Sequence, residues 1–439
     1  MTFCVALALA AVVVGHPSRA PVDPTLPSES YVLDNGLTVV LHDDPTVALV
    51  SVRVLYRLGS ADDPAGRQGL VHLLEHALFH GSEHIPSTAR REIARMSATR
   101  ANGVTTPDYM QLFETVPAAN LAAALRFEAD RMGYYRFDSK RIGAEKMIVN
   151  REMVERADRD RWAQADIAVL GVLFPESHPM HPATAVTVAR VSVPELKSLA
   201  EIAIAPNNAV LVLAGKLPSN TRELVTKYFA SLRRGSKFPL RPREHGRLAE
   251  EVRLSTSGAA DSAPLALIGW HAPHQGQDSH AAGSIAASIL RRRFVGRAAQ
   301  RGRRPLGATG AFAHLRAGRA YGVFVLGAVG ELGTSPESLA AQLDITLARL
   351  GESPPSEAEV AAARKRIAVS VSRQMDTLEM RAEVLAKSAA IGEDNVVESL
   401  LASLERVSPE DVSRFVREHL GATRGRAVVL QSPREAFGR

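Results

Sequence analysis

The most specific pattern in this sequence is the stretch Gly69-Leu70-Val71-His72-Leu73-Leu74-Glu75-His76-Ala77-Leu78-Phe79-His80-Gly81-Ser82. Its apolar residues recur at helical spacing, so we expect a helix over residues 68–79. Residues four apart share one face of a helix, so His72 and His76 can converge on one metal ion. Glu75 would then lie beside a metal-bound water, where a carboxylate can take and return a proton. The competing interpretation is a surface helix with two solvated histidines.

The composition is that of an ordinary globular protein. The chain has 439 residues, of which 46% are hydrophobic and 23% are charged. At about 100–200 residues per domain, two to four domains are expected, and neither a disordered chain nor a multi-span membrane protein fits. The net charge of +6 comes mostly from scattered arginines, and aromatic residues (5%) do not interleave with the basic clusters at 291–293 and 301–304. These features favour solvated surfaces or contacts to acidic peptides over a nucleic-acid site.

The N-terminus has the pattern of a secretory signal. Residues 5–14 form an uncharged apolar run, and the small residues Ser18 and Ala20 follow it. The run is shorter than the roughly 20 residues of a spanning helix, so we expect a signal peptide over residues 1–20, cleaved near Ala20, and a periplasmic or secreted protein. The n-region has no Lys or Arg, so an uncut anchor is the alternative. Cleavage would remove Cys4, the only cysteine, and leave His, Asp and Glu as the available metal ligands.

Periodicity and turn signals predict the remaining elements. Asp34-Asn35-Gly36 is a strong turn signal inside a predicted hairpin. Strands are expected over residues 31–41 (as this hairpin), 47–55 and 208–215, and helices over 120–132 and 138–157. The last two begin at residues that can serve as N-caps, Asn120 and Asp138.

The chain resembles a duplicated unit. Each half closes with a Ser-capped amphipathic helix followed by an apolar strand, near residues 192–214 and 408–430. The alternative is a chance likeness of two common helix–strand units. We expect an α+β fold with two homologous α/β-sandwich domains, each a mixed sheet flanked by helices. The predicted boundaries are 21–232 for the catalytic domain, 233–248 for a basic, Pro-containing linker, and 249–439 for the C-terminal domain.

The stretch from 69 to 82 is similar to the active-site helix of the pitrilysin/insulinase family of zinc metallopeptidases (inverzincins), and the chain resembles its bacterial processing-peptidase-like members. That family takes its third ligand from a helix about 76 residues after the second histidine. Glu152 lies 76 residues after His76, in a segment that resembles this helix. The resemblance implies one Zn²⁺ per chain, bound by His72, His76 and Glu152. It also implies that Glu145, two helical turns before Glu152, is a catalytic-site acid that orients a ligand.

A second segment, residues 101–109, resembles the family's substrate-binding edge strand. Asn102, Gly103, Val104 and Thr105 are therefore expected to bind the backbone of an extended substrate. The family usually has Ala where this chain has Gly103, and we expect the glycine to loosen the edge.

The C-terminal half departs from the family pattern. Many members carry an Arg and a Tyr there that contact substrate, but the nearest tract here runs from Arg304 to Ala308 and ends in Ala where the Tyr would be. Tyr321 is interpreted as an ordinary strand residue. The missing Tyr suggests that a second chain supplies this contact, in a homodimer or in a heterodimer with a homologous subunit that lacks the zinc motif. No metal role is expected for the other histidines near the motif or in the Pro-rich loop, His80, His84, His178 and His181.

The leading functional hypothesis is a zinc-dependent endopeptidase that cleaves peptides or unfolded segments, with Glu75 as general base. The alternatives are a noncatalytic scaffold, or a peptide-binding subunit that needs a partner in a heteromeric complex. We expect neither a nucleic-acid partner nor an integral membrane span.

Overall fold

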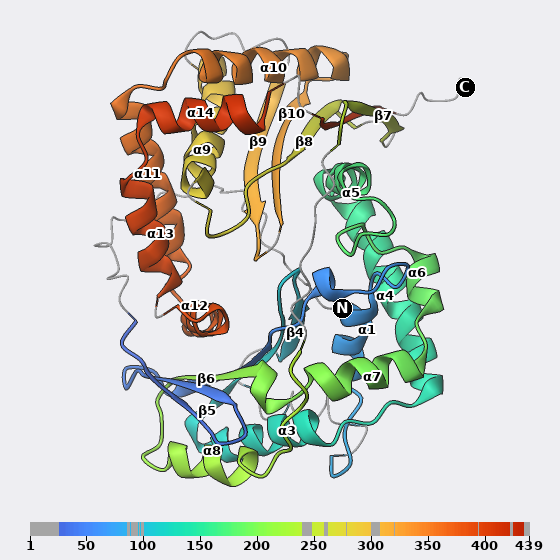
Figure 1. Ribbon diagram of the computed structural model, residues 1–439, viewed down its shortest axis with the longest axis vertical. Coiled ribbons are helices and arrows are strands. Elements are labelled where there is room, and N and C mark those ends of the chain that lie inside the picture. Colours follow the sequence, from blue (N-terminus) through green and yellow to red (C-terminus); the bar gives the residue numbers. More distant parts are fainter. Residues whose placement is uncertain are drawn as a thin grey trace.

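A computed structural model describes residues 26–85, 88, 95, 97, 101–238, 248–258, 262–277, 279–299, 308–319, 321–393, 395–421 and 425–433. These residues form two α/β domains, each a mixed sheet with flanking helices, and the expected fold class is confirmed. The first domain occupies the lower part of Figure 1 and the second the upper part. The predicted signal peptide and residues 239–247 of the predicted linker lie outside the described residues.

The first sheet has six strands in the order β1-β2-β6-β3-β5-β4. Only β2 and β6 are parallel, and the other neighbours are antiparallel. The predicted hairpin is confirmed, with Gly36 at φ +90° in its turn. The strands are β1 (Glu29–Val32), β2 (Thr38–Asp43), β3 (Leu49–Tyr56), β4 (Asn102–Thr105), β5 (Met110–Pro117) and β6 (Ala209–Gly215). The short β4 lies at the edge of the sheet, as expected for the segment after residue 101.

The second sheet repeats the topology of the first. Its order is β7-β11-β8-β10-β9, which matches β2-β6-β3-β5-β4 strand for strand. The sense of each pairing is also the same, with one parallel pair, β7 and β11, in the corresponding place. The strands are β7 (Val252–Ser257), β8 (Leu265–His271), β9 (Ala308–Ala317), β10 (Gly322–Gly330) and β11 (Ala427–Ser432). This repetition agrees with the predicted duplication, and β9 is the counterpart of the edge strand β4.

Helices cover one face of each sheet. In the first domain, Val50, Val52 and Val54 of β3 alternate toward a core shared with α1, α3, α7 and α8, as the two-residue period of a strand requires. The helices of the first half are α1 (Leu70–Ala77), α3 (Leu121–Gly133), α4 (Ser139–Arg159), α5 (Arg161–Leu173), α6 (Ala185–Arg190), α7 (Val193–Ala203) and α8 (Thr221–Phe229), with short 3-10 turns η1 (Ser60–Asp62), η2 (Ala118–Asn120) and η3 (Pro206–Asn208). The second half has α9 (Ser279–Ala299), α10 (Pro336–Glu352), α11 (Glu357–Arg373), α12 (Leu378–Ile391), α13 (Val396–Glu405) and α14 (Pro409–His419).

Each half contributes one helix to the opposite face of the other half's sheet. Helix α12 packs Leu385 and Ala386 against Val210 and Val212 of the first sheet. Helix α5 packs Val169 and its neighbours against β8 and β11 of the second sheet. Figure 1 shows α5 beneath the upper sheet and α12 above the lower one. Since buried apolar surface contributes about 25 cal/mol per Å², this exchange holds the two halves together.

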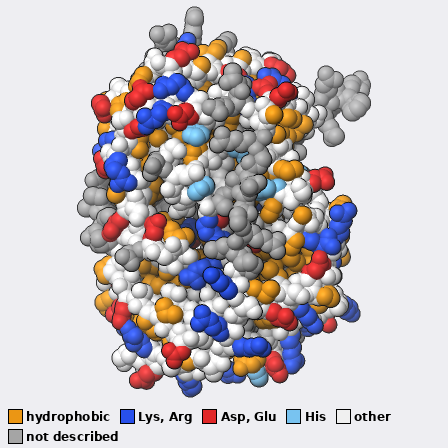
Figure 2. All heavy atoms as spheres, viewed as in Figure 1, with side chains coloured by type: hydrophobic (Ala, Val, Ile, Leu, Met, Phe, Trp, Pro, Cys, Tyr) orange, Lys and Arg blue, Asp and Glu red, His pale blue; other side chains and the backbone are white. Residues whose placement is uncertain are grey.

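The charge pattern agrees with scattered basic residues. On the face in Figure 2, Lys and Arg side chains are interspersed with Asp and Glu, with a small basic group near the centre. Among the described residues, no helix is both long and apolar enough to cross a membrane.

A buried charge cluster lies between β5 and α3. Glu114 and Glu128 are 2% and 1% exposed, and Arg131, also buried, donates to Glu128 with Nε–Oε2 at 3.2 Å. Burial, followed by repulsion from Glu128, raises the pKa of Glu114 well above its usual range. Two carboxylates therefore share one cation, and burial beside Glu128 favours the protonated form of Glu114.

This cluster predicts how stability depends on pH. Because the pKa of Glu114 is raised in the folded state, the unfolded chain loses this proton first, and the free energy of unfolding falls as the pH rises toward the folded pKa. Glu114→Gln removes this pH-dependent contribution. The free energies of unfolding of variant and wild type should therefore diverge, by up to about 1.4 kcal/mol per pH unit, as the pH rises above the pKa of Glu114 in the unfolded chain. Denaturant unfolding measured from pH 4.5 upward follows the divergence. Parallel curves for the two proteins would contradict it.

Candidate metal centre

Helix α1 is fixed at its start by a carboxylate from the preceding loop. Gly69 has φ +95° and provides no capping side chain. Asp63, which is 1% exposed, accepts hydrogen bonds from the backbone N–H groups of Gly69 (2.7 Å) and Val71 (2.9 Å). A negative charge at a helix N-terminus is favourable, and here it also satisfies buried donors. The helix then buries Leu73 and Leu74 in the first core, which holds its histidine-bearing face in place.

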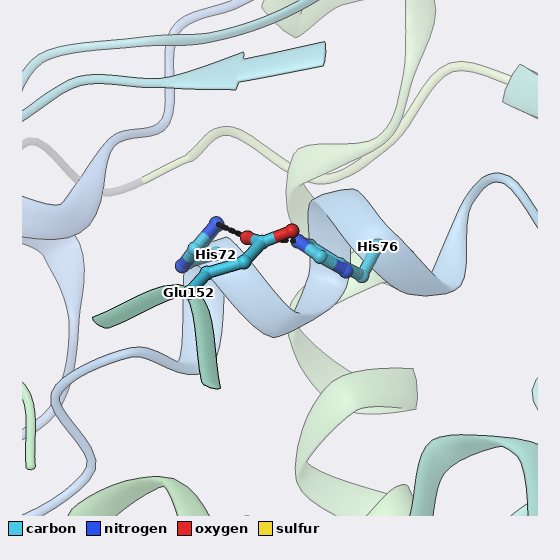
Figure 3. Close-up of side chains that lie close together, drawn as sticks. All are labelled: His72, His76 and Glu152. Atoms are coloured by element: carbon cyan, nitrogen blue, oxygen red, sulfur yellow. Dashed lines mark ion pairs between the residues drawn. The ribbon is translucent and has the colours of Figure 1, made fainter. Parts of the chain in front are cut away.

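Three side chains converge beside this helix. His72 and His76 come from α1 and Glu152 comes from α4, and one ligand atom of each lies within 4.8 Å of the others. Glu152 Oε2 is 3.8 Å from His72 Nε2 and 3.4 Å from His76 Nε2. Figure 3 shows the carboxylate of Glu152 between the two imidazole rings. The structure thus brings together the three residues that the sequence predicted as ligands.

The donor set fits a zinc ion. Tetrahedral zinc with bonds of about 2.0–2.1 Å places its ligand atoms roughly 3.3 Å apart. Glu152 Oε2 lies 3.4 and 3.8 Å from the two imidazole nitrogens, so small side-chain shifts would bring the three groups onto one ion. Two imidazole nitrogens and one carboxylate oxygen leave a fourth position for water or substrate, the arrangement of catalytic sites. Glu152 is 40% exposed, so the open side of the cluster is reachable from solvent.

Glu145 holds the second histidine from behind. Its Oε2 is 2.7 Å from His76 Nδ1, and its Oε1 is 2.8 Å from His80 Nε2. This contact directs His76 Nε2 toward the cluster, as carboxylates behind metal-binding histidines do. Burial opposes ionisation of Glu145, but the hydrogen bond with His76 and the close approach of His80 outweigh it and lower its pKa to about 2. His80 has a place in the site that sequence reasoning missed, and the signal was available in its spacing of four from His76.

The two histidines differ in basicity. Burial lowers the pKa of His72 to about 4, with further repulsion from His76. For His76 burial acts in the same direction, but hydrogen bonds to Glu145 and Glu152 prevail and raise its pKa to about 9. His72 is therefore neutral at physiological pH and ready to coordinate, whereas His76 gives up a proton when a cation binds.

Glu75 lies on α1 against the edge strand. It is 4% exposed, and Thr105 Oγ1 donates to its Oε2 at 2.6 Å. A Cβ on Gly103 would lie 2.5 Å from Glu75 Oε1, so the glycine leaves room for this carboxylate. That Gly103 loosens the edge stays a prediction, and its close approach to Glu75 is a feature that sequence reasoning missed. Thr105, expected to bind substrate, contacts the predicted base, while the roles of Asn102 and Val104 on β4 stay predictions.

The remaining predicted residues lie elsewhere. Residues 304–307 are outside the described residues, and Tyr321 lies in the turn before β10, with its carbonyl accepting from Gly318 N at 2.9 Å. His84 bonds to Asp130 (2.6 Å). The rings of His178 and Phe174 stack at 4.7 Å, and His181 Nδ1 is 2.8 Å from the Phe174 carbonyl. Within the described part of the chain, the cluster of His72, His76 and Glu152 is the one group with metal-binding geometry.

Comparison with known proteins places the chain in a family. The sequence model of "Insulinase (Peptidase family M16)" matches residues 38–166, and that of "Peptidase M16 inactive domain" matches residues 190–367. The zinc protease PqqE of Helicobacter pylori is 26% identical over 217 residues, 47% of each protein. An uncharacterized zinc protease of Mycobacterium bovis is 26% identical over 434 residues, 94% of this chain and 96% of that protein.

The fold is also found among solved structures. The crystal structure of a protease from Helicobacter pylori matches with a TM-score of 0.80 at 19% identity, over 93% of this chain and 99% of that one. The matched models span both halves, and the first of them contains the two histidines and the glutamate that converge beside α1. The chain therefore belongs to the pitrilysin/insulinase family of peptidases, family M16.

Proposed function

We propose that this protein is a zinc-dependent endopeptidase that cleaves extended peptides or unfolded segments. The observation that carries the proposal is the convergence of His72, His76 and Glu152, with Glu75 on the same helix. Relatives named zinc proteases support the choice of metal. These three residues would hold the zinc ion, which would supply Lewis-acid chemistry toward a carbonyl oxygen and a water.

The chain's own residues supply the proton transfers and the orientation. Glu75 takes a proton from the attacking water and returns it to the amine nitrogen of the leaving group. The hydroxyl of Thr105 donates to Oε2 of Glu75 and holds the carboxylate against the edge strand. Glu145 keeps His76 turned toward the cluster through Nδ1. The edge strand β4 offers backbone groups to an extended chain, which favours substrates without stable tertiary structure.

A partner-dependent peptidase is the second candidate, and one observation favours it. The tract from Arg304 to Ala308 ends in Ala where the resemblance to the family leads us to expect a Tyr that contacts substrate. A second copy or a homologous subunit could supply that contact. The scaffold alternative has less support, because the ligand positions and Glu75 are all intact. We further propose export to the periplasm or outside the cell, from the N-terminal pattern.

Metal analysis with a peptidase assay tests the proposal. Purified protein should contain about one zinc per chain, lose zinc and activity with a chelator, and recover both when zinc is returned. His72→Ala should lower zinc affinity by at least about 100-fold, because one of three protein ligands is lost. His84→Ala is the matched control, since His84 contacts Asp130 and not the cluster.

The outcomes separate the candidates. A chain that holds no zinc after gentle purification favours the scaffold. A zinc-loaded chain that cleaves peptides only after a homologous subunit is added favours the partner-dependent peptidase.

A further inference from the structure

The second half reaches the active-site half at one turn. The chain between β9 and β10 places Arg319 against Asp108, which lies in the turn between β4 and β5. The Arg319 backbone N–H is 3.3 Å from both carboxylate oxygens of Asp108, and its guanidinium donates to the Asp108 carbonyl at 3.0 Å. Arg319 Nε is also 3.6 Å from Asp108 Oδ1, and Nη2 is 3.8 Å from Asp62. Figure 1 shows the lower ends of β9 and β10 directed toward β4.

The approach of the two turns is close. A Cβ on Gly318 would lie 2.1 Å from Asp108 Oδ2, so the neighbouring residue of Arg319 must be small for the contact to form. Arg319 is 29% exposed and Asp108 19%, so solvent screens this pair only in part. The combination of backbone and side-chain donors on one aspartate fixes direction as well as distance.

The turn that carries Asp108 is joined to the 3-10 turn η1. Ser60 N donates to the Thr106 carbonyl at 2.8 Å, and Ala61 N donates to the Pro107 carbonyl at 3.0 Å. Asp62, at the end of η1, accepts from Gly59 N at 2.9 Å. The β4–β5 turn and η1 therefore form one hydrogen-bonded unit, and Arg319 contacts both parts of it.

Both parts of this unit support Glu75. Thr105, the last residue of β4, precedes the turn directly and donates to the Glu75 carboxylate. Asp63 follows η1 directly and caps α1, the helix that carries Glu75. A displacement of the unit would thus change the strand that orients the carboxylate and the helix that bears it.

We propose that Arg319 is a positioning residue for the reaction, through which the C-terminal half holds β4 and α1 in the register that orients Glu75. The proposal rests on the peptidase function proposed above. It gives the C-terminal half a defined task in the same chain. A misplacement of about 1 Å in a catalytic group can cost on the order of 100-fold in rate, so a contact outside the site can control turnover.

The test compares two arginines of the same hairpin. Arg319→Ala should lower kcat by about 10- to 100-fold with zinc content unchanged, and Arg319→Lys should recover part of the loss because a cation remains near Asp108 and Asp62. Arg316→Ala is the control. Arg316 on β9 donates two hydrogen bonds, of 2.6 and 2.7 Å, to Asp166 of α5, so this substitution breaks a different contact between the halves. Arg316→Ala should leave kcat within about twofold of wild type.

Hydrogen–deuterium exchange on the metal-free chains provides a readout independent of activity. Amides of residues 101–109 should exchange at least about tenfold faster in Arg319→Ala than in wild type or Arg316→Ala. Equal exchange in all three proteins, or unchanged kcat in Arg319→Ala, overturns the proposal. If the wild type has no peptidase activity in any combination, the proposed function fails, and faster exchange would then leave the coupling standing without its catalytic role.

Discussion

Replacing Glu75 with Gln is expected to lower kcat by about 1,000-fold while one zinc stays bound per chain. General base catalysis contributes about 100- to 10,000-fold, and glutamine cannot accept the proton of the attacking water. The metal should stay because the proposed ligands are His72, His76 and Glu152, and the amide is nearly isosteric with the carboxylate. An amide oxygen can still accept the hydrogen bond from Thr105, so β4 should keep its place.

The measurement pairs single-substrate kinetics with zinc analysis on the same preparation. Glu83→Gln is a matched control, because Glu83 makes an exposed ion pair with Arg136 at 3.4 Å outside the cluster. This variant should cleave at the wild-type rate. Undiminished cleavage by Glu75→Gln would refute the assigned base, and loss of zinc from it would show that Glu75 contributes to the metal site itself.

The local part of the site was predictable from the sequence. Helical periodicity and the spacing of four placed His72 and His76 on one face of α1, and Asp138 was correctly predicted to cap α4, where its side chain accepts from Arg141 N at 2.9 Å. Glu152 could not be derived in this way, because nothing local to α4 indicates which helix it will face. Its assignment came from the spacing that it shares with a family, and the structure brings it to the histidines.

The contacts that depend on tertiary structure had no sequence signal. Helix α12 packs Ala382 and Leu385 on the first sheet while Val384 joins a different cluster, so its periodicity does not say which sheet it covers. The proximity of Gly103 to Glu75 is likewise a property of how β4 lies against α1. A glycine in a strand suggests a close approach by another group, but not which group.

Replacing Asp63 with Ala should lower the free energy of unfolding by about 2–4 kcal/mol. The carboxylate accepts two backbone hydrogen bonds at the N-terminus of α1, and hydrogen bonds to a charged group contribute about 1.5–3 kcal/mol each, less any compensation by water. The favourable charge at the helix N-terminus adds about 0.3–1 kcal/mol. Because α1 carries both histidines, the same variant should also bind zinc more weakly.

Two further variants test whether burial causes this effect. Asp63→Asn should recover about half of the loss, because the amide keeps one acceptor oxygen and replaces the other with a donor. Asp138→Ala removes an exposed cap from α4, whose side chain accepts from Arg141 N, and should cost only about 1 kcal/mol. Denaturant unfolding of the metal-free proteins measures all three. Equal losses of unfolding free energy for Asp63→Ala and Asp138→Ala would contradict the role of burial. Water can bind the N–H group that an exposed cap leaves behind, whereas it cannot reach the buried N–H groups of Gly69 and Val71.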